Sequence, residues 1–143
     1  MRYRRLTSEE LEAVEVEFTK FLASQGLDAA EWQKVKSDNS HKVEYLLDEF
    51  STFFWDSTTS RITYLEKVTK EDRWLFKFGE SEAQVLRWQM KPGAEPGAEK
   101  PEISKGKKEF HQEARGREIF LLLEQGLLPC TPDRHEDLDP LFD

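Results

Sequence analysis

Hydrophobic and polar side chains alternate through the middle of the chain, between residues 61 and 90. Trp74, Phe76 and Phe78 alternate with Leu75 and Lys77, and successive residues of a β-strand point to opposite faces of a sheet. Strand-like runs at residues 62–68, 74–78 and 85–90 are separated by short polar segments. Segments of about four residues allow hairpins but are too short for a parallel crossover. The pattern predicts a three-stranded antiparallel meander.

The aromatic row Trp74, Phe76 and Phe78 has two interpretations. Aromatic side chains at alternate strand positions usually belong to a core, and the helices expected on either side of the meander could cover them. An uncovered row would instead form a platform on which nucleic-acid bases or a peptide stack. We expect the helices to cover it.

Helical periodicity precedes the meander. Thr7 and Glu10 form a capping box, which marks the start of a helix, and Gly26 is placed to end it. Apolar residues recur between them at intervals of three and four, as an amphipathic helix requires: Leu11, Val14, Phe18, Phe21 and Leu22. Similar signals predict a short second helix after Asp28 and a third over residues 43–54. We expect Arg4 and Arg5 to pair with glutamates of the first helix, although an edge strand or a basic arm is also compatible with this start.

A different composition follows the meander. Residues 91–104 contain the tetrapeptide Pro-Gly-Ala-Glu twice, which predicts a mobile loop. A helix is expected from Lys107 to Gln125, capped by Gly126. Residues 129–143 are acidic and interrupted by prolines, a composition typical of a tail that is unstructured until it is bound. The prediction is one α+β domain over residues 1–143: three N-terminal helices, the meander, a flexible loop and a C-terminal helix.

Composition narrows the class of protein. The 143 residues suit one domain with a real core. No run approaches the roughly 20 apolar residues that a membrane span needs, and no secretory signal is visible at the start. The single cysteine, Cys130, cannot form an internal disulfide, which agrees with a reducing compartment. We therefore expect a cytoplasmic protein. Its net charge of −8 argues against nucleic acid as the default partner.

Catalytic and cofactor motifs are absent from the sequence. There is no glycine-rich phosphate loop and no Gly-x-Ser-x-Gly elbow. His41, His111 and His135 lie in separate segments, without the local ligand pair that metal sites usually show. Cys130 lies close to His135 in sequence, but a nucleophilic thiol needs a base and an orienting group, and no third group is evident. We expect no cofactor, no metal and no catalytic set.

Two weaker signals concern charge and come from the region after the loop. Glu109 and Glu113 are four residues apart and could present two carboxylates to a divalent ion on one helix face, although neighbouring basic residues would neutralise them. Residues 100–117 hold six basic and three acidic residues, which makes them either a solvated helix start or an anion or RNA contact. The residues of that candidate contact are Lys105, Lys107, Lys108, Arg115 and Arg117.

Candidate partner-binding residues combine the sheet aromatics with apolar residues near the C-terminus. Leucine and phenylalanine amid acidic residues suit docking into a groove of a partner, against the alternative of a tail that folds back on its own domain. The candidates are Trp74, Phe76, Phe78, Leu138, Leu141 and Phe142.

The opening of the chain resembles a known family. Residues 2–11 read RYRRLTSEEL and residues 17–22 read EFTKFL, a pattern similar to the N-terminus of a family of short bacterial proteins of unknown function. The resemblance covers about a quarter of the chain and implies no activity. We expect a non-catalytic, adaptor-like protein that binds an unknown protein partner, and a homodimer through an exposed aromatic face is compatible with this. The alternative is a small RNA- or nucleotide-associated protein that uses the sheet aromatics and the basic residues of 105–117.

Overall fold

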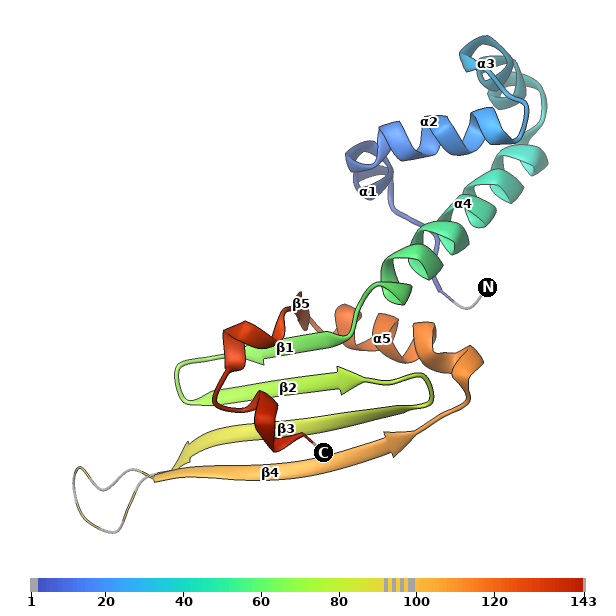
Figure 1. Cartoon of the computed structure of the whole chain (residues 1–143). Helices are drawn as coiled ribbons and strands as arrows, with labels where there is room; N and C mark the ends of the chain where they lie inside the picture. Colours follow the sequence, from blue (N-terminus) through green and yellow to red (C-terminus); the bar gives the residue numbers. More distant parts are fainter. Residues whose placement is uncertain (1–2, 92, 94, 96, 98–99, 143) are drawn as a thin grey trace. The chain divides into compact units, whose positions relative to one another are not determined.

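Helices fill the first part of the chain, and the strands follow together with one further α-helix (Figure 1). The computed structural model describes residues 3–91, 93, 95, 97 and 100–142. The chain divides into two units, Met1–Thr58 and Thr59–Asp143. The predicted class is confirmed: N-terminal helices are followed by an antiparallel meander and a C-terminal helix. The single domain stays a prediction.

The first unit contains the N-terminal helices α1 (Ser8–Ala13), α2 (Glu15–Ser24), α3 (Ala29–Asp38) and α4 (Ser40–Ser60). The capping box is present, because the Thr7 hydroxyl accepts a hydrogen bond from the Glu10 amide while the Glu10 carboxylate accepts one from the Thr7 amide. The first predicted helix is in fact two, since the backbone leaves helical geometry at Val14, where φ is −115° and ψ is 32°. Gly26 follows α2 with φ of +80°, as expected for a helix end.

Aromatic side chains dominate the core of this unit. Phe18 lies 5.0 Å from Phe50 and 5.5 Å from Trp32, measured between ring centroids. The remaining buried hydrophobic side chains among its described residues come from the start of the chain and from α2 and α4: Tyr3, Leu6, Leu22, Leu46 and Trp55.

Side chains of α4 hold the segment that precedes α1. The Leu6 amide donates to the Ser51 hydroxyl, and the Trp55 indole donates to the Arg4 carbonyl. Arg4 pairs with Glu10, as expected, but Arg5 pairs with Asp48 of α4 instead of a glutamate of the first helix. The start of the chain is therefore neither an edge strand nor a free basic arm over residues 3–7.

The second unit is built on a five-stranded antiparallel sheet: β1 (Tyr64–Val68), β2 (Asp72–Phe78), β3 (Glu82–Lys91), β4 (Lys100–Glu109) and β5 (Leu128–Cys130). The strand order is β4-β3-β2-β1-β5. The predicted meander forms the three central strands. The sheet therefore has two strands more than the three predicted, one at each edge.

Strand β4 corrects two further predictions. The predicted loop over 91–104 is shorter, because Lys91 still belongs to β3 and residues 100–104 already pair with it. Residues 92, 94, 96 and 98–99 of that loop lie outside the described residues. The predicted helix from Lys107 begins later, since α5 spans Arg115–Glu124 after a short 3₁₀ helix, η1 (Gln112–Ala114). Every residue of β4 is exposed, so its sequence carries no apolar face that would mark a strand.

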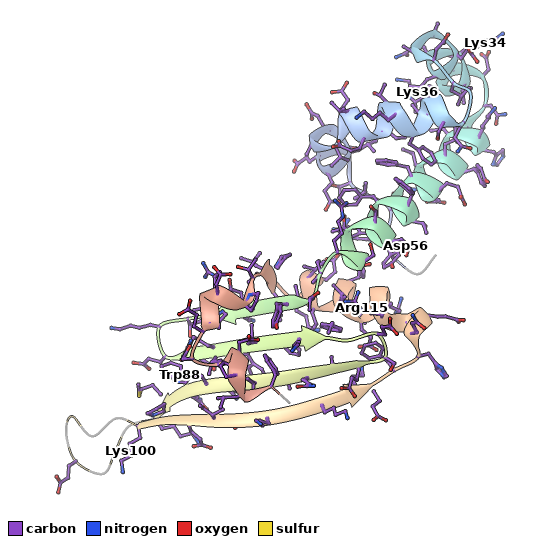
Figure 2. The ribbon with its side chains drawn as sticks, viewed as in Figure 1. Lys34, Lys36, Asp56, Trp88, Lys100 and Arg115 are labelled. Carbon is purple, nitrogen blue, oxygen red and sulfur yellow. The ribbon has the colours of Figure 1, made fainter. Side chains whose placement is uncertain are left out.

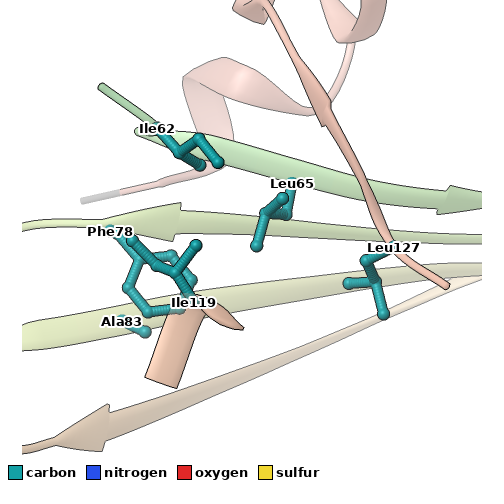
Figure 3. Close-up of a cluster of buried hydrophobic side chains, with 6 residues drawn as sticks. All are labelled: Ile62, Leu65, Phe78, Ala83, Ile119 and Leu127. Carbon is teal, nitrogen blue, oxygen red and sulfur yellow. The ribbon is translucent and has the colours of Figure 1, made fainter. Parts of the chain in front are cut away.

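The two faces of the sheet have different covers. Helix α5 packs Ile119 onto one face, against a cluster that includes Leu65 and Phe78 (Figure 3). The other face holds Leu75 and Leu86, which are covered by Leu138 and by two 3₁₀ helices, η2 (Pro132–His135) and η3 (Asp139–Leu141). The prediction of an unstructured tail over 129–143 is wrong for its described residues, because Leu138 is an apolar anchor with 1% of its surface exposed.

No helix in the described part of the chain combines the length and the apolar character that a membrane crossing requires.

Candidate functional site

An open apolar groove lies between α5 and strands β1 to β4 of the sheet. A hollow of about 420 Å³ is lined by Phe76, Val85 and Gly106 from the sheet and by Leu121 and Leu122 from α5. A neighbouring hollow of about 240 Å³ reaches Trp74 and shares Phe76 and Leu122 with the first. We call the two together the α5 groove. Ligand sites are typically concave and mostly apolar, so this groove is a candidate binding surface.

Gly106 leaves the β4 side of the groove open, because it has no side chain. It pairs with Val85 across β3 and β4, and a β-carbon at Gly106 would lie 2.8 Å from a methyl carbon of Val85. Any side chain there would have to displace Val85. The glycine therefore lets the two strands pair while β4 adds no side chain to the groove at this position.

The charged side chains of the groove carry a small positive excess. Among the described residues they are Lys67, Lys108 and Glu118. Lys107 also borders the groove, but its side chain points to the opposite face of the sheet, where its ammonium lies 2.9 Å from Glu82, which raises the pKa of Lys107. The Lys108 ammonium lies 2.8 Å from the Glu118 carboxylate, so Lys67 supplies the positive excess of the groove on a chain of net charge −8.

The predicted aromatic row is divided between core and groove. Phe78 is buried, with 4% of its surface exposed, whereas Trp74 and Phe76 are half-buried and line the groove. Their rings are nearly parallel, with centroids 6.4 Å apart and planes 13° apart. The Arg87 guanidinium lies 4.5 Å from the Trp74 ring centroid, a distance typical of a cation–π contact.

The five basic residues predicted to bind anions do not share one surface. Lys105 and Lys107 pair with Leu86 and Gln84 in the sheet, whereas Lys108 pairs with Ala83 and so points to the other face. Arg117 is exposed on α5.

Arg115, the fifth of these residues, has a structural role at the start of α5 (Figure 2). Its guanidinium donates hydrogen bonds to the carbonyls of Gly79, Thr59 and Ile62 at 2.9, 3.2 and 2.6 Å. Burial lowers the pKa of Arg115. These three bonds tie α5 to the segment before β1 and to the β2–β3 turn.

The three predicted partner-binding residues near the C-terminus contact their own sheet. Leu138 is buried against Leu75 and Leu86, and Leu141 and Phe142 pack around the same cluster. The Phe142 ring lies 6.3 Å from the Tyr64 ring and 5.7 Å from the Lys77 ammonium. In the structure the described residues of the tail fold back on their own sheet, which is the second of the two interpretations.

A buried polar cluster lies under this C-terminal segment. Glu66 of β1 accepts from Arg134 at 2.7 Å through one carboxylate oxygen, and its other oxygen lies 2.8 Å from Nε2 of His135. Cys130 at the end of β5 completes the group, and one potential ligand atom from each of Glu66, Cys130 and His135 lies within 4.8 Å of the other two. We call these three residues the Glu–Cys–His cluster. Glu66 and His135 are 7% and 3% exposed.

The thiol in this cluster is a poor nucleophile. Burial, followed by the negative charge of Glu66, raises the pKa of Cys130 to about 11. Because the thiolate is the reactive form, almost all of the thiol is unreactive at neutral pH. Glu66 is a third polar group beside Cys130 and His135, which the spacing of residues in the sequence did not reveal. It does not activate the cysteine.

The sequence contained one signal for this cluster. Glu66 interrupts an otherwise apolar strand face that includes Tyr64 and Val68, and a buried carboxylate needs a partner. The other carboxylate pair considered, Glu109 and Glu113, does not share a helix face, since Glu109 ends β4 and Glu113 lies in η1.

Together these features define an α+β protein with a helix-lined groove on one sheet face and a buried polar cluster on the other. The chain belongs to a family of unknown function, DUF6495, whose model matches residues 1–142. The resemblance seen over about the first quarter of the chain to a family of unknown function thus extends over nearly the whole chain. No curated protein and no solved structure matches it.

Proposed function

We propose that this chain is a non-catalytic binding protein whose α5 groove holds an acidic segment of a partner protein, anchored by leucine or phenylalanine side chains. The observation that carries the proposal is the combination of an apolar floor with a small positive excess on an acidic chain. Leu121 is 40% exposed at the wall of the groove, where an apolar anchor would cover it.

Electrostatic complementarity favours an acidic occupant. Of the three charged side chains that line the groove, counted over the described residues, two are lysines, Lys67 and Lys108. Opposite charges across an interface steer association and exclude wrong partners, and like charges oppose it. A basic segment would place its charges against Lys67 and Lys108.

The opposite face of the same sheet supports the proposal of an acidic occupant. There the chain holds its own acidic segment with apolar anchors: Leu138 fills the space over Leu75, and Arg73 pairs with Asp137 at 2.6 Å. Apolar anchors between acidic residues, with basic side chains of the sheet beside them, are the mode of recognition that we assign to the groove. The occupant belongs to a partner, because the chain's own segment is already placed.

The test selects binders from a displayed library of short random peptides and measures one selected peptide by fluorescence anisotropy. We expect enrichment of Asp and Glu next to Leu or Phe. The variant Leu121→Glu should weaken that peptide at least ~10-fold, because it places a carboxylate at the anchor site, and ~10-fold corresponds to about 1.4 kcal/mol of binding free energy. The matched control is Val68→Glu, an equally exposed apolar position on the other face, 47% exposed.

Three outcomes would overturn the proposal. One is enrichment of basic or purely apolar peptides, and another is binding that Leu121→Glu leaves unchanged. The third concerns RNA: oligonucleotide binding with a steep salt dependence, abolished by Trp74→Ala or by Lys108→Glu, would favour the alternative of a nucleic-acid-associated protein. Sedimentation of the same samples detects self-association through the groove, which would make a second copy the occupant and would also contradict the proposal.

A further inference from the structure

We propose that the Glu–Cys–His cluster is a zinc site. It contributes one oxygen, one sulfur and one nitrogen donor from Glu66, Cys130 and His135, which are brought together by β1, β5 and η2. Zn²⁺ is bound by these three donor types in proteins, and sites with three protein ligands keep a fourth position for water or another ligand. This inference is independent of the α5 groove, which lies on the opposite face of the sheet.

The donor set selects the class of metal. Thiolate and imidazole ligands favour zinc and the later transition metals, whereas Mg²⁺ and Ca²⁺ take oxygen ligands. One donor of each kind, close together and largely buried, excludes most of the water that a hard cation would keep.

The distances require a small adjustment. Metal–ligand bonds of ~2.0–2.3 Å in a tetrahedral arrangement place ligand atoms ~3.3–3.8 Å apart. The three ligand atoms lie within 4.8 Å of one another, and the shortest separation, 2.8 Å, is between Nε2 of His135 and Oε2 of Glu66. Zinc at Nε2 of His135 would shift the imidazole proton to Nδ1, so the Arg73 guanidinium 3.4 Å from Nδ1 would turn away. The Nε2 and Oε2 atoms would move apart by about 0.5 Å. Binding would convert the Cys130 thiol to a thiolate and release its proton to solvent.

Two arginines border the cluster. Arg134 contacts both Glu66 oxygens: its Nε lies 2.7 Å from Oε1, and its Nη2 donates to Oε2, the oxygen beside His135, at 3.3 Å. The shorter contact at Oε1 orients the carboxylate, and the longer one at Oε2 would give way to the metal. Arg73 opposes a cation, because its guanidinium lies 3.4 Å from Nδ1 of His135, but Asp137 neutralises it through two hydrogen bonds of 2.6 and 3.2 Å.

The local sequence fits the proposal. Cys130 and His135 are separated by four residues, and η2 turns the chain so that His135 comes back over β1. Glu66 comes from the strand that pairs with β5, where it lies opposite Leu128. The site therefore fastens the C-terminal segment to the sheet, and zinc would stabilise that attachment.

The test titrates the full chain, freed of metal, with Zn²⁺ in competition with a chromogenic chelator. We expect one zinc per chain. Cys130→Ser and His135→Gln should weaken binding at least ~100-fold, since even the loss of an outer contact costs 10–100-fold. His111→Gln, a change at an exposed histidine outside the cluster, is the matched control and should bind zinc as the unaltered chain does.

A second measurement needs no variant and so does not depend on whether a variant folds. Titration of the unaltered chain with Co²⁺ should produce the near-ultraviolet thiolate charge-transfer band and the intense visible bands of a tetrahedral cobalt site. Cobalt bands without the thiolate band, less than half a zinc per chain, or full affinity in a folded Cys130→Ser variant would each overturn the proposal.

Discussion

The two faces of the sheet are covered by different kinds of structure. On one face, α5 brings Ile119, which has no exposed surface, against Leu65 and Phe78. On the other, the C-terminal segment is held by one fully buried leucine, Leu138, and by a series of polar contacts. Those contacts are Tyr64 with Asp139 at 2.8 Å, Arg73 with Asp137 at 2.6 Å and His135 with Glu66 at 2.8 Å.

This difference follows from how each cover satisfies its own backbone. A helix pairs most of its own amides and carbonyls, so its side chains are free to make apolar contacts. Two short 3₁₀ helices leave more backbone unpaired and bury less apolar area, so side-chain hydrogen bonds must fix their position. Helix α5 thus forms a stable core with a groove at its edge, whereas the C-terminal segment depends on a few specific polar groups.

The largest effect is expected at the centre of the helix-covered face. Ile119→Ala should lower the free energy of unfolding by ~2–5 kcal/mol, because it leaves a cavity in a fully buried cluster. Urea unfolding followed by circular dichroism measures this. Leu121→Ala on the same helix is the control, and its cost should stay below ~1 kcal/mol because Leu121 is 40% exposed. Equal losses in the two variants would contradict this account of the core.

Leu138→Ala tests the other cover. A cost of ~2–3 kcal/mol is expected for the lost burial, and it should be confined to the C-terminal segment. Hydrogen exchange would show faster exchange in β5 and residues 134–142 with unchanged protection in α5 and β2. Loss of protection through the whole sheet would mean that the two covers are not separate.

Arg115→Met should cost about 1–3 kcal/mol, because three carbonyl groups lose their donor. Arg117→Met, two residues further along α5 at an exposed position, is the matched control and should change stability by less than ~0.5 kcal/mol. Thermal unfolding compares the two. If Arg115→Met were as stable as its control, Arg115 would not hold α5 in place.

Alkaline pH should weaken the C-terminal cover selectively. The pKa of Cys130 is raised to about 11 and that of Tyr64 to about 12, mainly by burial and then by Glu66 and Asp139 respectively. A pKa raised in the folded state contributes stability that is complete below the unfolded pKa and is lost as pH rises through the folded one. Stability should therefore fall from about pH 9 upward. The decline should be shallower in Cys130→Ser and Tyr64→Phe, as measured by urea unfolding at several pH values.

The same raised pKa predicts slow chemistry at the thiol. At pH 8 the folded chain should react with a disulfide reagent about 100-fold more slowly than the urea-unfolded chain, since a pKa near 11 in place of 9 lowers the thiolate fraction by that factor. Absorbance of the released thiol gives both rates. Equal rates would mean that Cys130 is not shielded by the cluster.

Much of the local structure could be predicted because its signals are local. The Thr7 capping box, the alternation from Trp74 to Phe78 and the position of Gly26 each depend on residues a few positions apart. For the candidate sites less was predictable. Trp74 and Phe76 were identified, but Leu121 was not among the candidate residues, and Glu66 could not be placed beside Cys130 from spacing alone.

The sequence by itself determined the class of fold, the central meander and the cover that α5 provides, because periodic apolar residues must be buried on one side of a helix or strand. Only the tertiary structure decided that the exposed residues Lys100–Glu109 form a strand, since their order comes from backbone pairing with β3 and not from an apolar face. It also decided the groove and the Glu–Cys–His cluster. Both depend on side chains far apart in the sequence: the groove forms only when α5 packs on the sheet, and the cluster only when β5 and the C-terminal segment return to it.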